Sequence, residues 1–313
     1  MDALRGVAAL VVVFYHLGYL CKFQFGFARG HLAVDLFFGL SGYVMARSYE
    51  ARLSSGLDAF GFIKIRLRRL WPTMAVGALL GALVFVGVIP WSIVMNWLIL
   101  ALMFMPFVSN IFPSFPINSP AWSVLFELIA NLGHALLLRR LRVPALLVLS
   151  AVCAAILLLF ARDMNIGVSP WTFWLGLARV LFSYCLGIVL WRLARDRQLF
   201  ACEWSIALLI GGIVLAGLVP ADQGWPEFVF AMLVSPVILC GGLAAPRYGK
   251  TTLRLLGELS FPLYAVHFPV INLGLRAGLP PALCLVAVLV TASLLRPLGN
   301  LKYPLRQSSP LAA

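Results

Sequence analysis

The stretch DALRGVAALVVVFYH occupies residues 2–16, and after its first residue the apolar run is interrupted only by Arg5 and His16. An α-helix needs about 20 such residues to cross the hydrocarbon core of a bilayer. Continuous apolar residues, rather than alternating ones, favour a helix over a strand. Because no cleavage site of the AxA type follows the run, we expect a retained membrane helix and not a signal peptide.

The rest of the chain repeats this apolar pattern. Of its 313 residues, 62% are hydrophobic and only 11% are charged, whereas a soluble domain carries about 25% charged residues. The lipid core admits only helices or closed barrels, so we predict an all-α, polytopic transmembrane helical bundle. We expect one membrane domain over residues 1–306 and a short disordered tail over 307–313. The candidate spans are 4–20, 33–49, 71–89, 92–107, 121–138, 144–161, 171–191, 204–219, 227–243, 258–275 and 281–298.

The net charge of +13 is gathered in short loops between the apolar segments. Lys and Arg concentrate in cytoplasmic loops of membrane proteins, so this distribution argues against nucleic acid as a partner. The basic loop after the second segment places the N-terminus in the cytoplasm, and the loops from residue 139 onward alternate and end inside. We therefore expect both termini to be cytoplasmic. The six cysteines are scattered singly without metal-type spacing, so we expect core residues and no metal.

In the first half of the chain, the number of apolar segments exceeds by one the number of membrane crossings that this topology allows. Three apolar segments lie between Arg69 and Arg139, although both residues are expected in the cytoplasm. One segment should therefore be incomplete, and the uncharged, proline-rich stretch 106–120 is the best place for the irregularity. Non-helical backbone is tolerated at membrane depth where it is buried in protein or lines a cavity. We predict about ten spans with one re-entrant or partial segment.

Ionisable residues within a bilayer are costly and are treated as functional by default. Arg5 and His16 are eleven positions apart, which places them on one helix face, about 16 Å apart in height. Arg5 should lie near the cytoplasmic surface and His16 in the outer half. The simpler alternatives are that Arg5 snorkels to the interface as a topology anchor, and that His16 merely hydrogen-bonds a neighbour.

The second segment begins VDLFFGLSG, residues 34–42, and contains Asp35. This carboxylate should start on the outer side near His16, where it could orient the imidazole and stabilise its protonated form. A water-exposed residue at the positive end of the helix dipole explains Asp35 equally well. Ser41 and Gly42 permit close packing against another helix.

Three further groups of polar residues suggest chemistry. Arg66 and Arg69 share a face at i, i+3, and guanidinium groups bind phosphate in a bidentate manner; a positive-inside anchor is the alternative. Ser123 and Glu127 lie one turn apart in an apolar helix, where a lone carboxylate should be paired or protonated. The third group is a polar stripe along one helix. As an alternative to a role in chemistry, these residues could form hydrogen bonds between helices. Its members are Ser260, Tyr264 and His267.

Taken together, these motifs resemble the acyltransferase 3 family of bacterial membrane O-acyltransferases. The resemblance covers nearly the whole chain in order. It comprises DALRGVAALVVVFYH with Arg5 and His16 eleven apart, VDLFFGLSGYV, the RxxR of Arg66 and Arg69 before Trp-Pro, PAWSVLFE and SFPLYAVH. Phe261 departs from the pattern, because it stands where the family usually has a tyrosine.

The resemblance implies transfer of an acyl group, often acetyl, from cytoplasmic acyl-CoA to a hydroxyl of a cell-surface or lipid-linked glycan. It places the protein in the bacterial inner membrane, among membrane lipids. Arg5 and His16 match the essential pair of the family's first helix, and Arg66 and Arg69 match its second basic motif. The periplasmic esterase-like domain of some members is not found here, so we expect the chain to act alone or with a separate periplasmic partner protein.

We therefore predict that Arg5, Arg66 and Arg69 bind the CoA phosphates, and that His16, Asp35 and Glu127 are catalytic. His16 would act either as general base on the acceptor hydroxyl or as an acylated relay. Buried polar residues also mark substrate and proton paths, so a transporter or flippase is the alternative. A structural membrane scaffold is a third hypothesis.

Overall fold

The computed structural model describes residues 1–23, 26–195, 200–241 and 248–299, and this part of the chain is helical without strands. The predicted all-α class is therefore confirmed, and each predicted apolar segment overlaps at least one helix. The predicted tail over 307–313 lies outside the described residues. The α-helices are α1 (Asp2–Cys21), α2 (Ala33–Ser54), α3 (Ala59–Val84), α4 (Trp91–Leu102), α5 (Ala121–Leu136), α6 (Val143–Phe160), α7 (Leu175–Ala194), α8 (Cys202–Gly217), α9 (Trp225–Val229), α10 (Ser235–Gly241), α11 (Lys250–Arg276) and α12 (Pro281–Gly299).

Among the described residues, five helices are long and apolar enough to cross a membrane: α1, α3, α6, α7 and α12. Two more, α2 and α11, are as long, at 22 and 27 residues. These two carry more charged residues, which lie mostly at their ends. The predicted multi-pass membrane bundle is thus confirmed in outline, whereas the number of ten spans stays a prediction.

The helix α4 is shorter than predicted: it ends at Leu102, whereas the predicted segment extends to residue 107. Its 12 residues rise about 18 Å, whereas the hydrocarbon core is about 30 Å thick. The connection over residues 103–120 contains no helix, in agreement with its many prolines. This segment is therefore the best candidate for the incomplete crossing.

The connection before α5 is buried against other helices at its C-terminal end. Asn118 is buried, and its side-chain amide donates a hydrogen bond to the Ala265 carbonyl of α11 at 2.9 Å. That carbonyl lacks its usual helical donor, because residue 269, four positions later, is a proline without an N–H. A loop side chain thus replaces the missing backbone hydrogen bond, which meets the requirement for irregular backbone inside a bundle.

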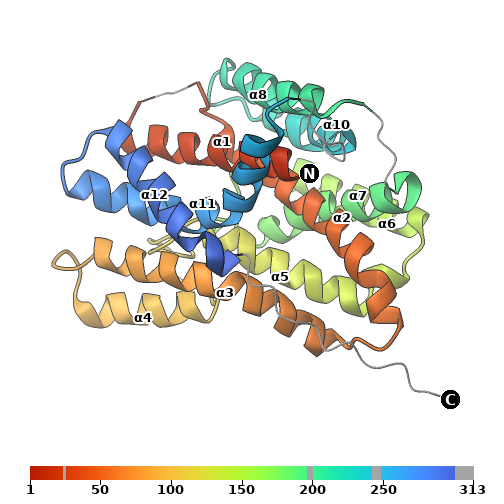
Figure 1. The fold of residues 1–313 in the computed structure, drawn as a ribbon, viewed down its shortest axis with the longest axis horizontal. Coiled ribbons are helices and arrows are strands. Elements are labelled where there is room, and N and C mark those ends of the chain that lie inside the picture. Colours follow the sequence, from red (N-terminus) through yellow and green to blue (C-terminus); the bar gives the residue numbers. More distant parts are fainter. Residues whose placement is uncertain (24–25, 196–199, 242–247, 300–313) are drawn as a thin grey trace.

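The helices pack in pairs that are distant in sequence. The first helix, α1, packs along α11, and α2 packs along α7, while α3 contacts both α4 and α11. Figure 1 shows α8 and α10 at one side of the bundle and α3 and α4 at the opposite side. Of the helices that carry predicted site residues, α1, α2, α5 and α11 lie between these two sides in this view, whereas α3 lies at one side.

Glycines allow α2 and α7 to approach until their backbones touch. A Cβ atom at Gly42 would lie 2.0 Å from the Tyr184 carbonyl oxygen, and one at Gly187 would lie 2.0 Å from the Gly39 carbonyl oxygen. The close packing that we predicted is therefore confirmed at Gly42. This contact fixes the position of α2 against α7.

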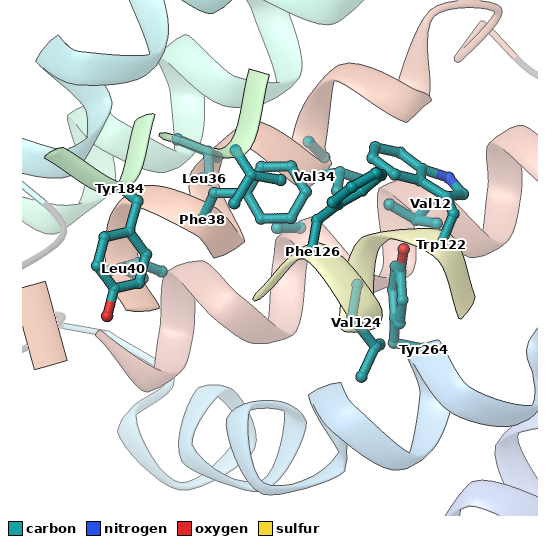
Figure 2. Close-up of a cluster of buried hydrophobic side chains, with 14 of the residues drawn as sticks. Val12, Val34, Leu36, Phe38, Leu40, Trp122, Val124, Phe126, Tyr184 and Tyr264 are labelled. Atoms are coloured by element: carbon teal, nitrogen blue, oxygen red, sulfur yellow. The ribbon is translucent and has the colours of Figure 1, made fainter. Parts of the chain in front are cut away.

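Aromatic side chains then hold α5 against α2. The Phe38 ring lies 6.1 Å from the Trp122 ring, and Trp122 lies 6.3 Å from Phe126, both edge to face. Figure 2 shows these side chains in one cluster with residues of α1, α7 and α11. Such pairs stabilise a core beyond the area that they bury. The cluster fixes the helix that carries Ser123 and Glu127.

The contact between α2 and α7 can be tested by adding a single methyl group. We expect Gly42→Ala to destabilise the protein by about 1–3 kcal/mol, the usual cost of overpacking a core, because its Cβ would meet backbone that cannot move aside. Gly211→Ala on α8 is the matched control, since no atom lies within 4 Å of its Cβ. The measurement is the thermal unfolding midpoint of detergent-purified protein, and equal midpoints for the two variants would contradict the prediction.

Candidate functional site

A cavity between α1, α2, α3, α5 and α11 brings together residues of the N-terminal 127 residues and of α11. Apolar side chains of α2 and α3 form much of its wall, including Phe37, Leu40, Val44 and Leu70. Most of the site residues that we predicted from the sequence line it as well. These are Arg5, Arg66, Arg69, Ser123, Glu127, Ser260 and Tyr264.

Part of the cavity wall is cationic because α1 and α3 bring three guanidinium groups to it. Arg5 comes from the first turns of α1, and Arg66 and Arg69 come from α3. The third helix begins at residue 59, well before the predicted start at 71, because the Asp58 side chain caps it by accepting the Gly61 N–H at 3.0 Å. The RxxR motif is therefore held on a regular helix, one turn apart, and not in a loop.

Glu127 faces these arginines from α5. Its Oε1 atom accepts a hydrogen bond from Arg66 at 2.8 Å and another from Ser41 at 2.7 Å. Arg66 is itself buried, with 5% of its surface exposed. Three guanidinium groups and one carboxylate leave a formal charge of +2 on the cavity lining, which suits a ligand with several anionic groups. The structure thus places Glu127 with the arginines and not with His16.

The polar stripe of α11 continues the wall of the cavity. The Tyr264 hydroxyl lies 2.6 Å from the Ser123 hydroxyl, and it also donates to the Pro120 carbonyl at 3.2 Å. Ser260 donates to the Gly257 carbonyl of its own helix at 2.6 Å. Phe261, where a tyrosine hydroxyl was expected from the resemblance, also lines the cavity. The stripe therefore faces the site, as its helical spacing suggested.

His16 and His267 form a pair just beyond the cavity. The His16 Nδ1 atom lies 3.1 Å from the His267 Nε2 atom. His267 follows Tyr264 by less than one helical turn, and their rings are 5.8 Å apart. Tyr264 therefore connects the cavity wall to the histidine pair. This arrangement joins α1 to α11, two helices that the sequence separates by more than 200 residues.

Asp35 has a different partner from the one that we predicted. Its two carboxylate oxygens accept hydrogen bonds from Arg179 of α7, at 2.9 Å to Nε and 2.8 Å to a terminal nitrogen. Both side chains are almost completely buried. The polar contacts of His16 run instead to His267 and to the Val12 carbonyl. The interpretation of Asp35 as the group that orients His16 is therefore wrong, because Arg179 occupies the carboxylate.

Arg179 belongs to a buried polar cluster that the sequence analysis did not identify. Arg179 also donates to the His31 carbonyl at 3.1 Å, and the His31 ring lies 3.2 Å from Glu227. Arg29 lies 3.5 Å from the other oxygen of Glu227. Arg179 was detectable, because it is a charged residue inside the apolar segment 171–191. The roles of Arg29 and Glu227 were not, because both lie in segments that resemble ordinary polar loops.

Comparisons with known proteins agree with the motifs. A family model described as an acyltransferase domain matches residues 1–296. Protein 2 in the picA locus of Rhizobium radiobacter is 32% identical over 184 residues, covering 52% of this chain and 94% of that protein. A protein of Komagataeibacter xylinus, named as a proposed membrane-bound transacylase, BcsY, is 28% identical over 290 residues, covering 86% of this chain and 72% of that protein. No solved structure matches the chain.

The ion pair between Asp35 and Arg179 should contribute to stability more than to ligand binding. We expect Arg179→Met to destabilise the protein by about 3–5 kcal/mol, because it leaves a buried carboxylate without a partner. The double variant Arg179→Met with Asp35→Leu should be more stable than Arg179→Met alone, since no buried charge is left unpaired. Thermal unfolding of the purified variants tests both statements. A double variant that loses the sum of the two single losses would show that the groups do not interact.

Proposed function

The chain belongs to the acyltransferase family whose model covers residues 1–296, and from this premise we propose that it transfers an acyl group from cytoplasmic acyl-CoA to a carbohydrate hydroxyl. Its helices and its family make it an integral membrane O-acyltransferase. We further propose acetyl-CoA as the donor. The acceptor that we propose is a cell-surface or lipid-linked glycan.

The convergence of Arg5, Arg66 and Arg69 on one cavity carries this proposal. Coenzyme A bears several phosphate charges, and guanidinium groups bind phosphates through paired, charge-assisted hydrogen bonds. Beyond the arginines the cavity is lined by Phe37 and Leu40, which suit an uncharged arm and a small acyl group. A donor with an anionic head and a neutral reactive end fits both parts of this lining.

We propose that the arginine-lined part of the cavity faces the cytoplasm of a bacterial inner membrane, with both termini on that side. The basic loops support this orientation, because Lys and Arg are retained on the cytoplasmic side. The 20 residues of α1 rise about 30 Å, and His16 lies about 16 Å above Arg5. The histidine is then in the outer half of the membrane, nearer to an acceptor that is presented from outside.

His16 is the residue that we assign as general base. It removes the proton of the acceptor hydroxyl while the oxygen attacks the acyl carbon. The new C–O ester bond forms, the C–S thioester bond breaks, and the proton passes through His16 to the sulfur of the released CoA. Ser123 and Tyr264 line the cavity wall, and we propose that they border the path of the acyl group, since their hydroxyl protons are already used within the protein.

The two carboxylates then have supporting roles. Glu127 holds Arg66 through Oε1, so we propose that it orients this arginine and balances part of the positive charge when no donor is bound. Asp35 fixes α2 against α7 through Arg179. Both roles differ from direct participation in the transfer of the proton, which we assign to His16.

The arginines can be tested against a matched neighbour. We expect Arg66→Ala and Arg69→Ala to weaken acetyl-CoA binding by about tenfold to a hundredfold each, the loss that corresponds to one hydrogen bond to a charged group. Arg68→Ala is the control, because Arg68 lies on the same helix between the two but is absent from the cavity lining. Calorimetric titration of purified protein with acetyl-CoA measures the affinity.

Titration with dephospho-CoA, which lacks one phosphate, extends this test. If the arginines bind phosphates, this ligand should bind the wild-type protein more weakly, and the difference should shrink in the Arg66 and Arg69 variants. An equal loss for Arg68→Ala, or unchanged binding in the other two variants, would overturn the assignment of the donor site.

The role of His16 is tested by transfer of radiolabelled acetyl groups. We expect His16→Ala to lower the rate of transfer from acetyl-CoA to membrane carbohydrate by about 100- to 10,000-fold, the usual contribution of a general base. Binding of acetyl-CoA should remain, because the arginines are intact. A folded His16→Ala protein that transfers label at the wild-type rate would falsify this role.

Three further measurements separate the alternatives. Label that becomes attached to His16 before it reaches carbohydrate would indicate an acylated relay. Movement of a glycan across vesicles without transfer of label would indicate the transporter or flippase. Unchanged modification of the cell surface after loss of His16 and Glu127 would indicate a scaffold.

A further inference from the structure

The protonation of His267 is determined by its place in α11. Its Nδ1 atom lies 3.0 Å from the Leu263 carbonyl oxygen and 2.9 Å from the Tyr264 carbonyl oxygen. Carbonyl oxygens only accept hydrogen bonds, so Nδ1 must carry the ring proton. In a neutral imidazole the other nitrogen is then an acceptor. His267 is completely buried, and its Nε2 atom therefore presents a lone pair to His16.

The contacts of His16 likewise determine which of its ring nitrogens carries the proton. Its Nδ1 atom lies 3.1 Å from the Val12 carbonyl oxygen and 3.1 Å from Nε2 of His267. Both neighbours are acceptors, so Nδ1 of His16 is the donor to both. The Nε2 atom of His16 is then the nitrogen with the available lone pair. Two independent sets of backbone carbonyls, on α1 and α11, thus agree on one arrangement of protons.

We propose that His267 is the positioning residue that keeps His16 in the Nδ1–H tautomer, so that its Nε2 atom serves as the base. This inference rests on the proposed function, because it concerns the same reaction. The sequence suggested Asp35 for this position, and the structure gives that carboxylate to Arg179. The neutral imidazole of His267, and not the Asp35 carboxylate, is therefore the acceptor for the Nδ1–H of His16.

The arrangement has a direct consequence for the transfer step. When His16 Nε2 takes the acceptor's hydroxyl proton, the ring becomes an imidazolium whose Nδ1–H is already donated to His267. A hydrogen bond from a charged donor is stronger than one between neutral groups, so His267 stabilises the charged ring most when the proton has been taken. The proton then leaves from Nε2 to the CoA sulfur as the C–S bond breaks and the C–O bond forms, and the resting tautomer returns.

The tautomers can be measured without any donor or acceptor. The chain has four histidines, so the full-length protein labelled with ¹⁵N-histidine in lipid nanodiscs gives a small set of ring signals. Single substitutions assign them. At neutral pH we expect His16 and His267 each to show a protonated Nδ1 and a bare Nε2. A resting protein in which His16 carries its proton on Nε2 would overturn the proposal.

Two substitutions at position 267 give the second test. In His267→Leu the acceptor is lost, so part of His16 should change to the Nε2–H tautomer, and the transfer rate at saturating acetyl-CoA should fall by about tenfold to a hundredfold, less than for loss of the base itself. The KM for acetyl-CoA should not change. His267→Gln keeps an acceptor oxygen near the Nε2 position, so it should recover most of the rate.

The controls distinguish this role from simple packing between α1 and α11. His134→Gln replaces another fully buried histidine outside the cavity, and its rate per folded protein should equal that of the wild type. If His267→Leu only lowers the amount of folded protein, with an unchanged rate and an unchanged His16 tautomer, the positioning role is wrong. If the wild type shows the expected tautomers but transfers no acyl group, the proposed function fails while the paired arrangement of the histidines stands.

Discussion

The buried ion pair between Asp35 and Arg179 is the interaction on which the arrangement of this bundle depends. It lies between α2 and α7, where glycines already bring the two backbones into contact. Neither charge could remain inside the bundle without the other, because isolated charges are very costly in a medium of low dielectric constant. The pair therefore fixes the position of α2 along α7, and α2 in turn forms much of the wall of the cavity.

Within this framework the polar residues form two groups. The arginines of α1 and α3 line the cavity together with Glu127, and the histidines of α1 and α11 lie beyond Tyr264. In the reaction that we propose, the charged ligand head needs fixed positive charge, whereas the proton-transfer step needs a neutral imidazole. Separation along the helix axis meets both requirements in one site.

Helical spacing explains why much of the site was predictable. Arg5 and His16 share one face of α1, and Ser260, Tyr264 and His267 share one face of α11, so a regular helix fixes their relative positions without any tertiary information. Partners on other helices were not predictable in this way. Asp35 was expected beside His16 because both should lie at the outer side, yet depth in the membrane does not determine which neighbour a side chain faces.

The sequence by itself determined the all-α class, the apolar helices and the faces on which the functional residues lie, because these depend on composition and on the period of the helix. Only the tertiary structure decided the partners: Arg179 for Asp35, Arg66 for Glu127 and His267 for His16. It also showed that α4 ends at Leu102, after 12 residues. The physical reason is that hydrogen bonds and ion pairs act over about 3 Å. Only the packing of helices brings residues from distant parts of the chain within that distance.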